Sequence, residues 1–271
     1  MEKLLREAGA CAVGCVAVRR LRPYMSEPAW ERAVQTTPGL KSLICAAFPY
    51  GPEHITSGKI SLYARGADYH QVLRARLIPV AEELARRYPG CRFDFYADVS
   101  PFPEVRGAGL AGLGRLGKNG LLITENAGSF VFLGFLATDA ALPETGGEII
   151  PCRGCGACQT ACPGGALGEG LDQDRCLSAI TQQRGELTGP QADLVKQGGL
   201  LWGCDRCQLA CPENRHRTVF ALPEFLPQPD PVEAELQLSD RQFRKRFAGR
   251  AFTWRGVQPL RRNAEILKED S

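Results

Sequence analysis

Eight of the 12 cysteines in this 271-residue chain lie between residues 152 and 211. They form two runs. The first reads C-x2-C-x2-C-x3-C-P, and the second is a lone cysteine followed, after a gap, by C-x2-C-x3-C-P. Clustered cysteines in a chain without signs of export indicate metal binding rather than disulfides. The first run is typical of bacterial ferredoxins, which hold two [4Fe–4S] clusters. The sequence therefore predicts a module that passes single electrons.

The ferredoxin pattern also predicts which cysteines share a cluster, because the fourth cysteine of the first run binds the cluster of the other run. One cluster is then held by Cys152, Cys155, Cys158 and Cys211, and the other by Cys162, Cys176, Cys204 and Cys207. Zinc is the alternative, since it also takes four thiolates. Two crossed runs that each end in Cys-Pro favour clusters.

The remaining cysteines, Cys11, Cys15, Cys45 and Cys91, are isolated in apolar or strand-like stretches. We expect buried free thiols there. The first 18 residues predict an amphipathic helix, in which Cys11 and Cys15 would lie one turn apart, and a metal role for that pair is the alternative. Glu2 in this stretch argues against the basic start of a signal peptide.

The composition is that of a globular protein, with 44% hydrophobic and 23% charged residues. The net charge of +3 does not by itself indicate a nucleic-acid partner. Apolar runs stay well short of the roughly 18 residues of a membrane span, because the best of them, residues 130–136, is interrupted by Gly134. We therefore expect a cytoplasmic protein that does not bind membranes.

The order of the segments predicts an α+β chain in three parts: an α/β domain over residues 1–148, a ferredoxin-like domain over 149–218, and a linker with a short basic tail over 219–271. Hydrophobic periodicity and the turn residues that end each run predict the elements of the first part. These elements are a strand at 42–50, a helix at 61–90, a strand at 91–101, a helix-like segment at 103–114, and a hairpin formed by 121–124 and 128–138.

The stretch GLGRLG contains a G-x-G-x-x-G pattern at Gly112, Gly114 and Gly117. A dinucleotide-binding turn follows a strand and opens a helix. Here a helix-like segment precedes the glycines and the strand-like LLIT follows them. The order argues against dinucleotide binding and favours a tight turn or a close approach of the backbone to another group.

Four stretches together resemble the epoxyqueuosine reductase family, cobalamin- and iron–sulfur-dependent enzymes of tRNA modification. They are YARGADYH at 63–70, the segment 97–119 that contains ADVSP and AGLGRLGKN, the cysteine block at 152–215, and SDRQFRKRFAGRAFTWRG at 239–256. The resemblance implies a first domain like the corrinoid-binding domain of reductive dehalogenases, with base-off cobalamin between it and the cluster domain. It also implies a short form of the family, without the C-terminal helical repeats.

The resemblance implies site residues as well. Asp98, at a strand end before Pro101, corresponds to the catalytic acid, although Val99 stands where the family usually has a small residue. The residues implied to contact the cofactor are Tyr63, Arg65, His70, Asp98, Gly117, Lys118, Asn119, Leu122 and Ser178.

The chemistry of the implied reaction agrees with this set of groups. Reduction of an epoxide to an alkene takes two electrons and two protons, and iron–sulfur clusters deliver single electrons at low potential. The protein must supply a proton, which a carboxyl with a pKa raised by burial can do. Asp98 is predicted to have this role, with a loop-capping aspartate as the alternative. His70 is predicted either to orient the substrate or to cap a helix.

Residues 241–262 carry eight cations and no acid, interleaved with aromatic residues. The cations are Arg241, Arg244, Lys245, Arg246, Arg250, Arg255, Arg261 and Arg262, and the aromatic residues are Phe243, Phe247, Phe252 and Trp254. This pattern predicts binding of tRNA phosphates with stacking of bases. The alternative is a solvated basic helix face packed by its phenylalanines.

Two other functions stay open from the sequence: a corrinoid-dependent reductase of a small molecule, and a ferredoxin-like electron-transfer protein without a substrate of its own. Each needs a low-potential electron donor that the sequence does not identify. A monomer is compatible with the lack of any heptad pattern, but the oligomeric state is left open.

Overall fold

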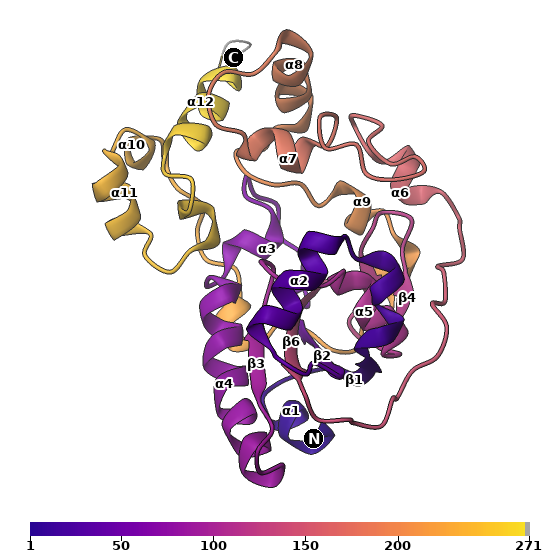
Figure 1. Ribbon diagram of the computed structural model, residues 1–271. Helices are drawn as coiled ribbons and strands as arrows, with labels where there is room; N and C mark the ends of the chain where they lie inside the picture. The colour runs from indigo at the N-terminus through magenta and orange to yellow at the C-terminus, as the bar shows by residue number, and fades with distance from the viewer. Residues whose placement is uncertain (269–271) are drawn as a thin grey trace.

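The computed structural model describes residues 1–268, and its centre is a four-stranded sheet (Figure 1). The strand order is β1-β2-β6-β3, and every neighbouring pair is antiparallel. The strands are β1 (Ala12–Ala17), β2 (Ser42–Pro49), β6 (Val131–Thr138) and β3 (Phe93–Tyr96). Every residue of β2 is buried, as the uninterrupted apolar run at 42–50 predicts. The predicted mixture of helices and strands is therefore confirmed.

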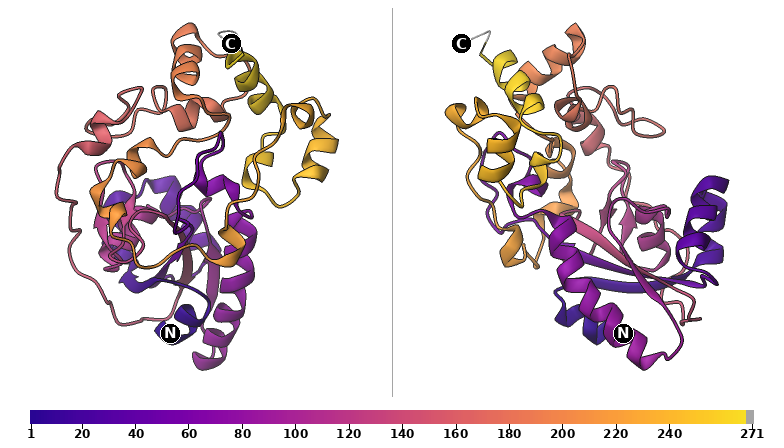
Figure 2. Two further views of the ribbon diagram at one scale, coloured as in Figure 1. Left: turned by 180° about the vertical axis from the view of Figure 1, so that it is seen from behind. Right: turned by 60° about the vertical axis from the view of Figure 1, so that its left-hand side comes forward.

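Helices cover both faces of this sheet because β2 and β6 carry apolar side chains on both sides. On one face, Leu73 and Leu77 of α4 (Tyr69–Arg87) pack with Phe48, beside α1 (Glu2–Glu7). On the other face, Ala108 of α5 (Glu104–Leu110) and Ala33 of α2 (Glu27–Thr36) pack with Leu43 and its neighbours. Figure 2 shows α4 and α2 on opposite sides of the sheet.

The single helix predicted at 61–90 is wrong, because the chain breaks there into α3 (Leu62–Arg65) and α4. Gly66 packs against backbone, since a Cβ on it would lie 2.6 Å from the Cα of Phe225. Asp68 then starts α4 by accepting a hydrogen bond from the His70 backbone N–H at 3.0 Å. Such a cap satisfies a backbone N–H of the first helical turn, so α4 can begin here without continuing from α3. The break turns His70 and Asp68 toward the candidate site.

Two further predictions about the first part are also wrong. The hairpin joins β4 (Arg115–Leu116) to β5 (Leu122–Ile123), whereas β6 enters the main sheet between β2 and β3. The N-terminal helix ends at Glu7, and the next residues form the edge strand β1, so Cys15 lies on a strand and is buried. In both cases a short apolar run did not show its structure or its partner strand, and pairing with strands distant in the sequence decided it.

Gly112 and Gly114 of GLGRLG lie in the turn between α5 and β4, in the helix-then-strand order expected from the sequence, and Gly117 follows β4. Gly112 has φ +83°, and a Cβ on Gly114 would lie 2.3 Å from the carbonyl oxygen of Ile123. The glycines are therefore needed for a tight turn and for the close approach of two backbone segments.

The remaining chain forms two helical regions above the sheet (Figure 1). The helices of the cysteine block are α6 (Ala157–Thr160), α7 (Leu177–Gln182), α8 (Gly189–Gly198) and α9 (Arg206–Leu209). The C-terminal helices are α10 (Glu233–Leu236), α11 (Asp240–Arg246) and α12 (Gln258–Ile266). Short 3-10 turns lie at 18–20, 22–24, 212–215, 223–225 and 251–253.

The C-terminal helices pack onto the rest of the molecule through one apolar cluster. Phe243, Phe247 and Phe252 are buried there with Ile60 and Trp202. Among the helices that the structure describes, none is long and apolar enough to cross a membrane. The predicted domain boundaries stay predictions.

Candidate functional site

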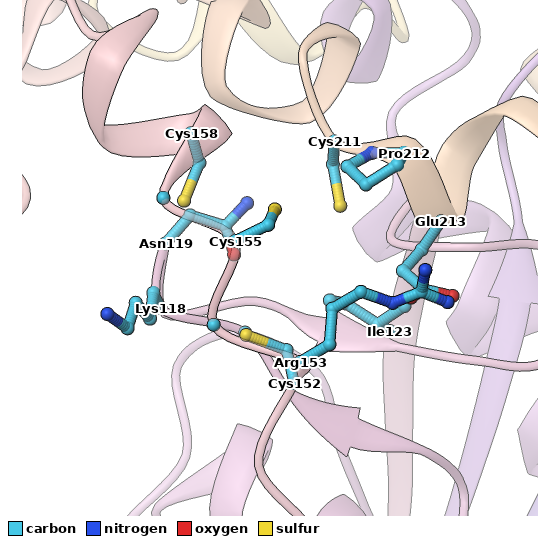
Figure 3. A pocket seen from close by; sticks show the side chains of 13 residues that line it. Lys118, Asn119, Ile123, Cys152, Arg153, Cys155, Cys158, Cys211, Pro212 and Glu213 are labelled. Atoms are coloured by element: carbon cyan, nitrogen blue, oxygen red, sulfur yellow. The ribbon is translucent and has the colours of Figure 1, made fainter.

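The structure brings four cysteines distant in sequence around one hollow at the surface. Cys152, Cys155, Cys158 and Cys211 line it, and their sulfur atoms point into a common space (Figure 3). The chain enters this loop beside the β4–β5 hairpin, because the Cys152 N–H donates to the Leu116 carbonyl at 2.9 Å. We call these four residues the surface quartet.

The other four cysteines of the block, Cys162, Cys176, Cys204 and Cys207, line a cavity of about 470 Å³. We call them the cavity quartet. Burial and, to a smaller extent, the neighbouring thiols of Cys204, Cys176 and Cys162 together raise the pKa of Cys207 to about 12. The structure thus groups the cysteines as the crossed ferredoxin pattern predicts.

The donor set of each quartet fits a [4Fe–4S] cluster, which binds four thiolates, one on each iron. Within residues 1–268, no three His, Cys, Asp or Glu side chains are placed to hold a single metal ion. The thiols of each quartet stand around a space rather than around one point. Which cysteines bind iron stays a prediction.

The cavity beside the second quartet contains some of the side chains predicted to contact the cofactor. Tyr63, Asn119 and Ser178 line it, whereas Gly117 and Lys118 line the hollow of the surface quartet. Arg65 and Leu122 lie elsewhere. Arg65 is buried and donates to the carbonyl oxygens of Ile60 and Thr56, which fixes that loop. Leu122 is packed in the core under the sheet.

Sequence reasoning missed several lining residues, among them Leu121, Phe132 and Gln208. Leu121 comes directly before β5, next to the predicted contact Leu122. Gln208 has no comparable signal in the sequence. Its amide is held by the Tyr50 hydroxyl at 3.0 Å and by the Ser129 carbonyl at 2.9 Å.

The walls of the cavity are chemically suited to a flat ring edged with amides. Phe132 and Tyr50 form an aromatic side, with ring centroids 4.4 Å apart. Leu121, Leu167 and Leu177 add apolar surface, and the amides of Asn119, Gln173, Gln182 and Gln208 add polar groups. Asp205 ties the cluster loop to the first domain by accepting from the Ser61 hydroxyl at 2.6 Å. The corrin of cobalamin has the shape and polar edge that such a lining fits.

Asp98 lies in the loop after β3 and has φ +60°. Among residues 1–268 it is the one non-glycine with positive φ, a conformation that is costly unless its surroundings hold it. His70 Nε2 lies 3.3 Å from Asp98 Oδ2, and His70 Nδ1 lies 2.8 Å from Asp68 Oδ1. The imidazole therefore bridges two carboxylates, Asp68 at the start of α4 and Asp98 in the loop after β3.

The protonation of His70 and Asp98 differs from what the sequence predicts. Hydrogen bonds to Asp68 and Asp98 raise the pKa of His70 to about 9. The same bond to His70 lowers the pKa of Asp98, because the carboxyl is half exposed and its ionised form is favoured by the imidazolium. The expected rise of the Asp98 pKa through burial is therefore not what the structure shows. At neutral pH the proton of the pair sits on His70.

Stacked rings connect this pair to the cavity. The Tyr69 ring stacks on His70 with centroids 4.0 Å apart, and on Phe132 with centroids 4.4 Å apart. Phe132 lines the cavity. The negative charge of Asp98 also contributes to a raised pKa of Tyr63, whose main cause is burial. Asp98 thus lies at the edge of the cavity without lining it.

The basic run at 241–262 divides into two groups. Arg246 pairs with Glu235, Arg250 is buried, and Arg261 and Arg262 donate to backbone carbonyl groups. Arg250, Arg261 and Arg262 therefore serve packing, as do the three buried phenylalanines, whereas Arg246 is exposed and its charge is neutralised by Glu235. The exposed group comprises Arg241, Arg244, Lys245 and Trp254, with the Arg255 guanidinium stacked 3.9 Å from the Trp254 ring centroid.

Comparison with known protein families gives two matches. Residues 31–99 match the model described as Epoxyqueuosine reductase QueG, DUF1730. Residues 151–214, which contain all eight cysteines of the block, match the 4Fe-4S double cluster binding domain.

Curated epoxyqueuosine reductases are similar over most of this chain. The protein of Lactococcus garvieae is 37% identical over 212 residues, which cover 76% of this chain and 60% of that protein. The protein of Gloeobacter violaceus is 36% identical over 256 residues, which cover 89% of this chain and 80% of that protein. The chain therefore spans three fifths of the first relative and four fifths of the second.

Solved structures agree with these relatives. An epoxyqueuosine reductase with an epoxyqueuosine-modified tRNA-Tyr stem loop is 26% identical, with a TM-score of 0.82 over 98% of this chain and 80% of that one. The Bacillus subtilis epoxyqueuosine reductase with its catalytic aspartate loop swung out of the active site is 27% identical, with a TM-score of 0.82 over the same shares. The likeness to the corrinoid-binding domain of reductive dehalogenases stays a prediction.

Proposed function

Because this chain belongs to the epoxyqueuosine reductase family, we propose that it reduces epoxyqueuosine to queuosine in tRNA. The observation that carries the proposal is the placement of a cysteine quartet on the wall of a cavity that has the Asp98–His70 pair at its edge. An electron-delivery site and a proton source thus meet at one open cavity. A tRNA substrate implies a cytoplasmic enzyme.

Two [4Fe–4S] clusters and cobalamin are the proposed cofactors. The surface quartet and the cavity quartet would each hold one cluster. Asn119, Ser178 and Tyr63, together with Leu121 and Phe132, would surround the corrin. Bound cobalamin would supply a strongly reducing nucleophile, chemistry that amino-acid side chains do not provide.

The chain's own residues would transfer the protons to the substrate. Opening the epoxide and losing its oxygen as water takes two protons with the two electrons. Asp98, which is ionised at neutral pH, would pass to the epoxide oxygen a proton that it takes from His70, held by Asp68, and solvent would reprotonate His70 to supply the second proton. A pKa of about 9 keeps His70 protonated at neutral pH, so that it can act as the reservoir. The strained backbone at Asp98 would hold its carboxyl toward the cavity.

The exposed cations at 241–245 and the Trp254–Arg255 pair would contact tRNA. Phosphate contacts give affinity without sequence preference, and an exposed indole offers a surface on which a base can stack. Arg246 and the packed arginines of the same run would not take part, because their guanidinium groups are already bound to backbone or acid.

The test is an analysis of tRNA nucleosides. The chain is expressed, with cobalamin supplied, in bacteria that lack their own epoxyqueuosine reductase, and the digested tRNA is examined by mass spectrometry. We expect epoxyqueuosine to disappear and queuosine to appear.

Persistence of epoxyqueuosine, with both clusters and cobalamin present on the purified protein, would contradict the proposal. It would point to a corrinoid reductase with another substrate. A protein that carries iron but retains no cobalamin would instead indicate an electron-transfer protein.

A further inference from the structure

The two cysteine quartets differ in how a partner protein can reach them. Cys155 of the surface quartet is exposed, whereas the four thiols of the cavity quartet are all partly buried. Gly154 and Gly156 flank Cys155 with φ +72° and +76°. A Cβ on Gly154 would have only the Lys118 Cε within 4 Å, at 3.9 Å. The backbone around Cys155 is therefore bare on that side, and another protein surface can come close to it.

The cavity quartet faces inward, toward the space proposed for the cofactor. A carrier protein cannot enter a cavity of about 470 Å³. The exposed Cys155 gives the surface quartet the shortest path to another protein, so we place the entry of electrons there, with transfer onward to the cavity quartet.

The hollow beside Cys155 is lined by two cations and one acid. Lys118 and Arg153 line the hollow itself (Figure 3). The acid that lines it, Glu213, is paired with Arg153 at 2.6 Å. Lys118 is exposed, so its positive charge faces an approaching partner.

We propose that the surface around Cys155, bordered by Lys118 and Arg153, docks an acidic one-electron carrier protein. The inference rests on the proposed function, since it assumes that the surface quartet holds a cluster. In each encounter the carrier is oxidised by one electron and the cluster is reduced by one. Two encounters supply the two electrons of one turnover. Opposite charges increase the rate of such encounters, and salt weakens the effect.

The test measures reduction of the clusters, not turnover. Protein loaded with both clusters is mixed anaerobically with reduced flavodoxin, an acidic one-electron carrier, and the bleaching of the cluster absorbance is followed by stopped flow. Lys118→Glu should lower the second-order rate constant by about tenfold at low salt, and Lys118→Gln should lower it by less. The difference from the unmodified protein should shrink as salt is added.

Arg74→Glu is the matched control, because Arg74 is exposed on α4, away from α6 and the cysteine loop (Figure 1). It makes the same change of net charge and should leave the rate constant unchanged. A photoreduced deazaflavin radical, a small uncharged reductant that needs no docking surface, should bleach all variants at equal rates.

An equal decrease of the flavodoxin rate constant in Lys118→Glu and Arg74→Glu would overturn the proposal, because net charge alone would then explain the decrease. Slower bleaching of Lys118→Glu by the uncharged deazaflavin radical would also overturn it, since the cluster itself would be altered. An unchanged flavodoxin rate with weaker binding of a tRNA stem loop would make the surface an RNA contact instead. Normal docking without epoxyqueuosine reduction would leave this inference standing and remove the proposed function.

Discussion

The sheet and the cysteine block are held together by different kinds of interaction. Each residue of β2 is buried, and apolar clusters lie on both faces of the sheet. In the cysteine block, α6 and α9 are four residues long, and the main apolar cluster consists of Leu177, Ile180 and Val195. Each fully buried aliphatic side chain contributes about 1.5–3 kcal/mol. The sheet therefore has ample apolar burial, whereas the block has little.

This difference implies that the eight cysteines stabilise the fold of the block in addition to their functional role. Helices of one turn are not stable by themselves. When a binding site forms only in the folded state, the binding free energy of its metal stabilises the fold. We expect the clusters to hold the block and apolar packing to hold the sheet.

The largest expected effect comes from removing iron. In protein prepared without clusters, backbone amides of α6 and α9 should exchange with solvent at rates orders of magnitude higher than in the loaded protein, because the loops around the quartets lose their anchor. Amides of β2 and β6 should keep their protection. Hydrogen exchange read by mass spectrometry makes the measurement. Equal protection of α6 and α9 with and without iron would show that the clusters do not stabilise the cysteine block.

The second effect separates chemistry from folding. Asp98→Asn keeps the size of the side chain but removes the acid, and it should lower kcat for epoxyqueuosine reduction by at least about 100-fold, the usual contribution of an acid–base group. Iron content and cluster absorbance should stay unchanged, because Asp98 lies in the loop after β3, outside both quartets. Full activity in this variant would remove Asp98 from the mechanism.

The third prediction tests the packing of the sheet. Gly14 lies in β1, and a Cβ there would come 2.1 Å from the backbone carbonyl oxygen of Ala111. Gly14→Ala should therefore destabilise the protein by about 3 kcal/mol, as overpacking does. Gly147→Ala is the control, since a Cβ on Gly147 meets nothing within 4 Å. Urea unfolding followed by circular dichroism gives the free energy of unfolding of both variants. Similar decreases of this free energy in the two variants would show that the sheet is not tightly packed at Gly14.

The smallest effect concerns pH. The His70 pKa is raised from 6.5 to about 9, so the stability gained from its bonds to Asp68 and Asp98 is fully present below about pH 6.5 and is lost as pH rises through 9. The lowered pKa of Asp98 keeps the pair charged down to acidic pH. His70→Gln should cost about 0.5 kcal/mol at pH 6, because the pair is partly exposed to solvent.

The same variant should cost nothing measurable at pH 10. Urea unfolding of both proteins at the two pH values gives the difference. A cost that grows above pH 9 would show that His70 stabilises the fold as a neutral ring, by stacking on Tyr69 rather than by its charge.

Local patterns in the sequence predicted features that depend on residues near one another. The run at 42–50 predicted β2 because an uninterrupted apolar stretch of that length has to be buried. Helix 61–90 was wrong at Gly66, because the contact that requires a glycine there comes from Phe225, about 160 residues later. The pairing of β6 with β2 and β3 depended in the same way on distant partners.

Spacing and short motifs in the sequence predicted the family, the crossed grouping of the eight cysteines and the role of Asp98, since they fix which side chains a loop can present. The fold was needed to bring His70 between Asp68 and Asp98, to place Leu121 rather than Leu122 at the cavity, and to use three of the eight cations of the basic run for packing. The physical reason is that charge state and burial depend on neighbours brought in by the fold. A pKa or an exposed surface is a property of that surrounding, not of the residue alone.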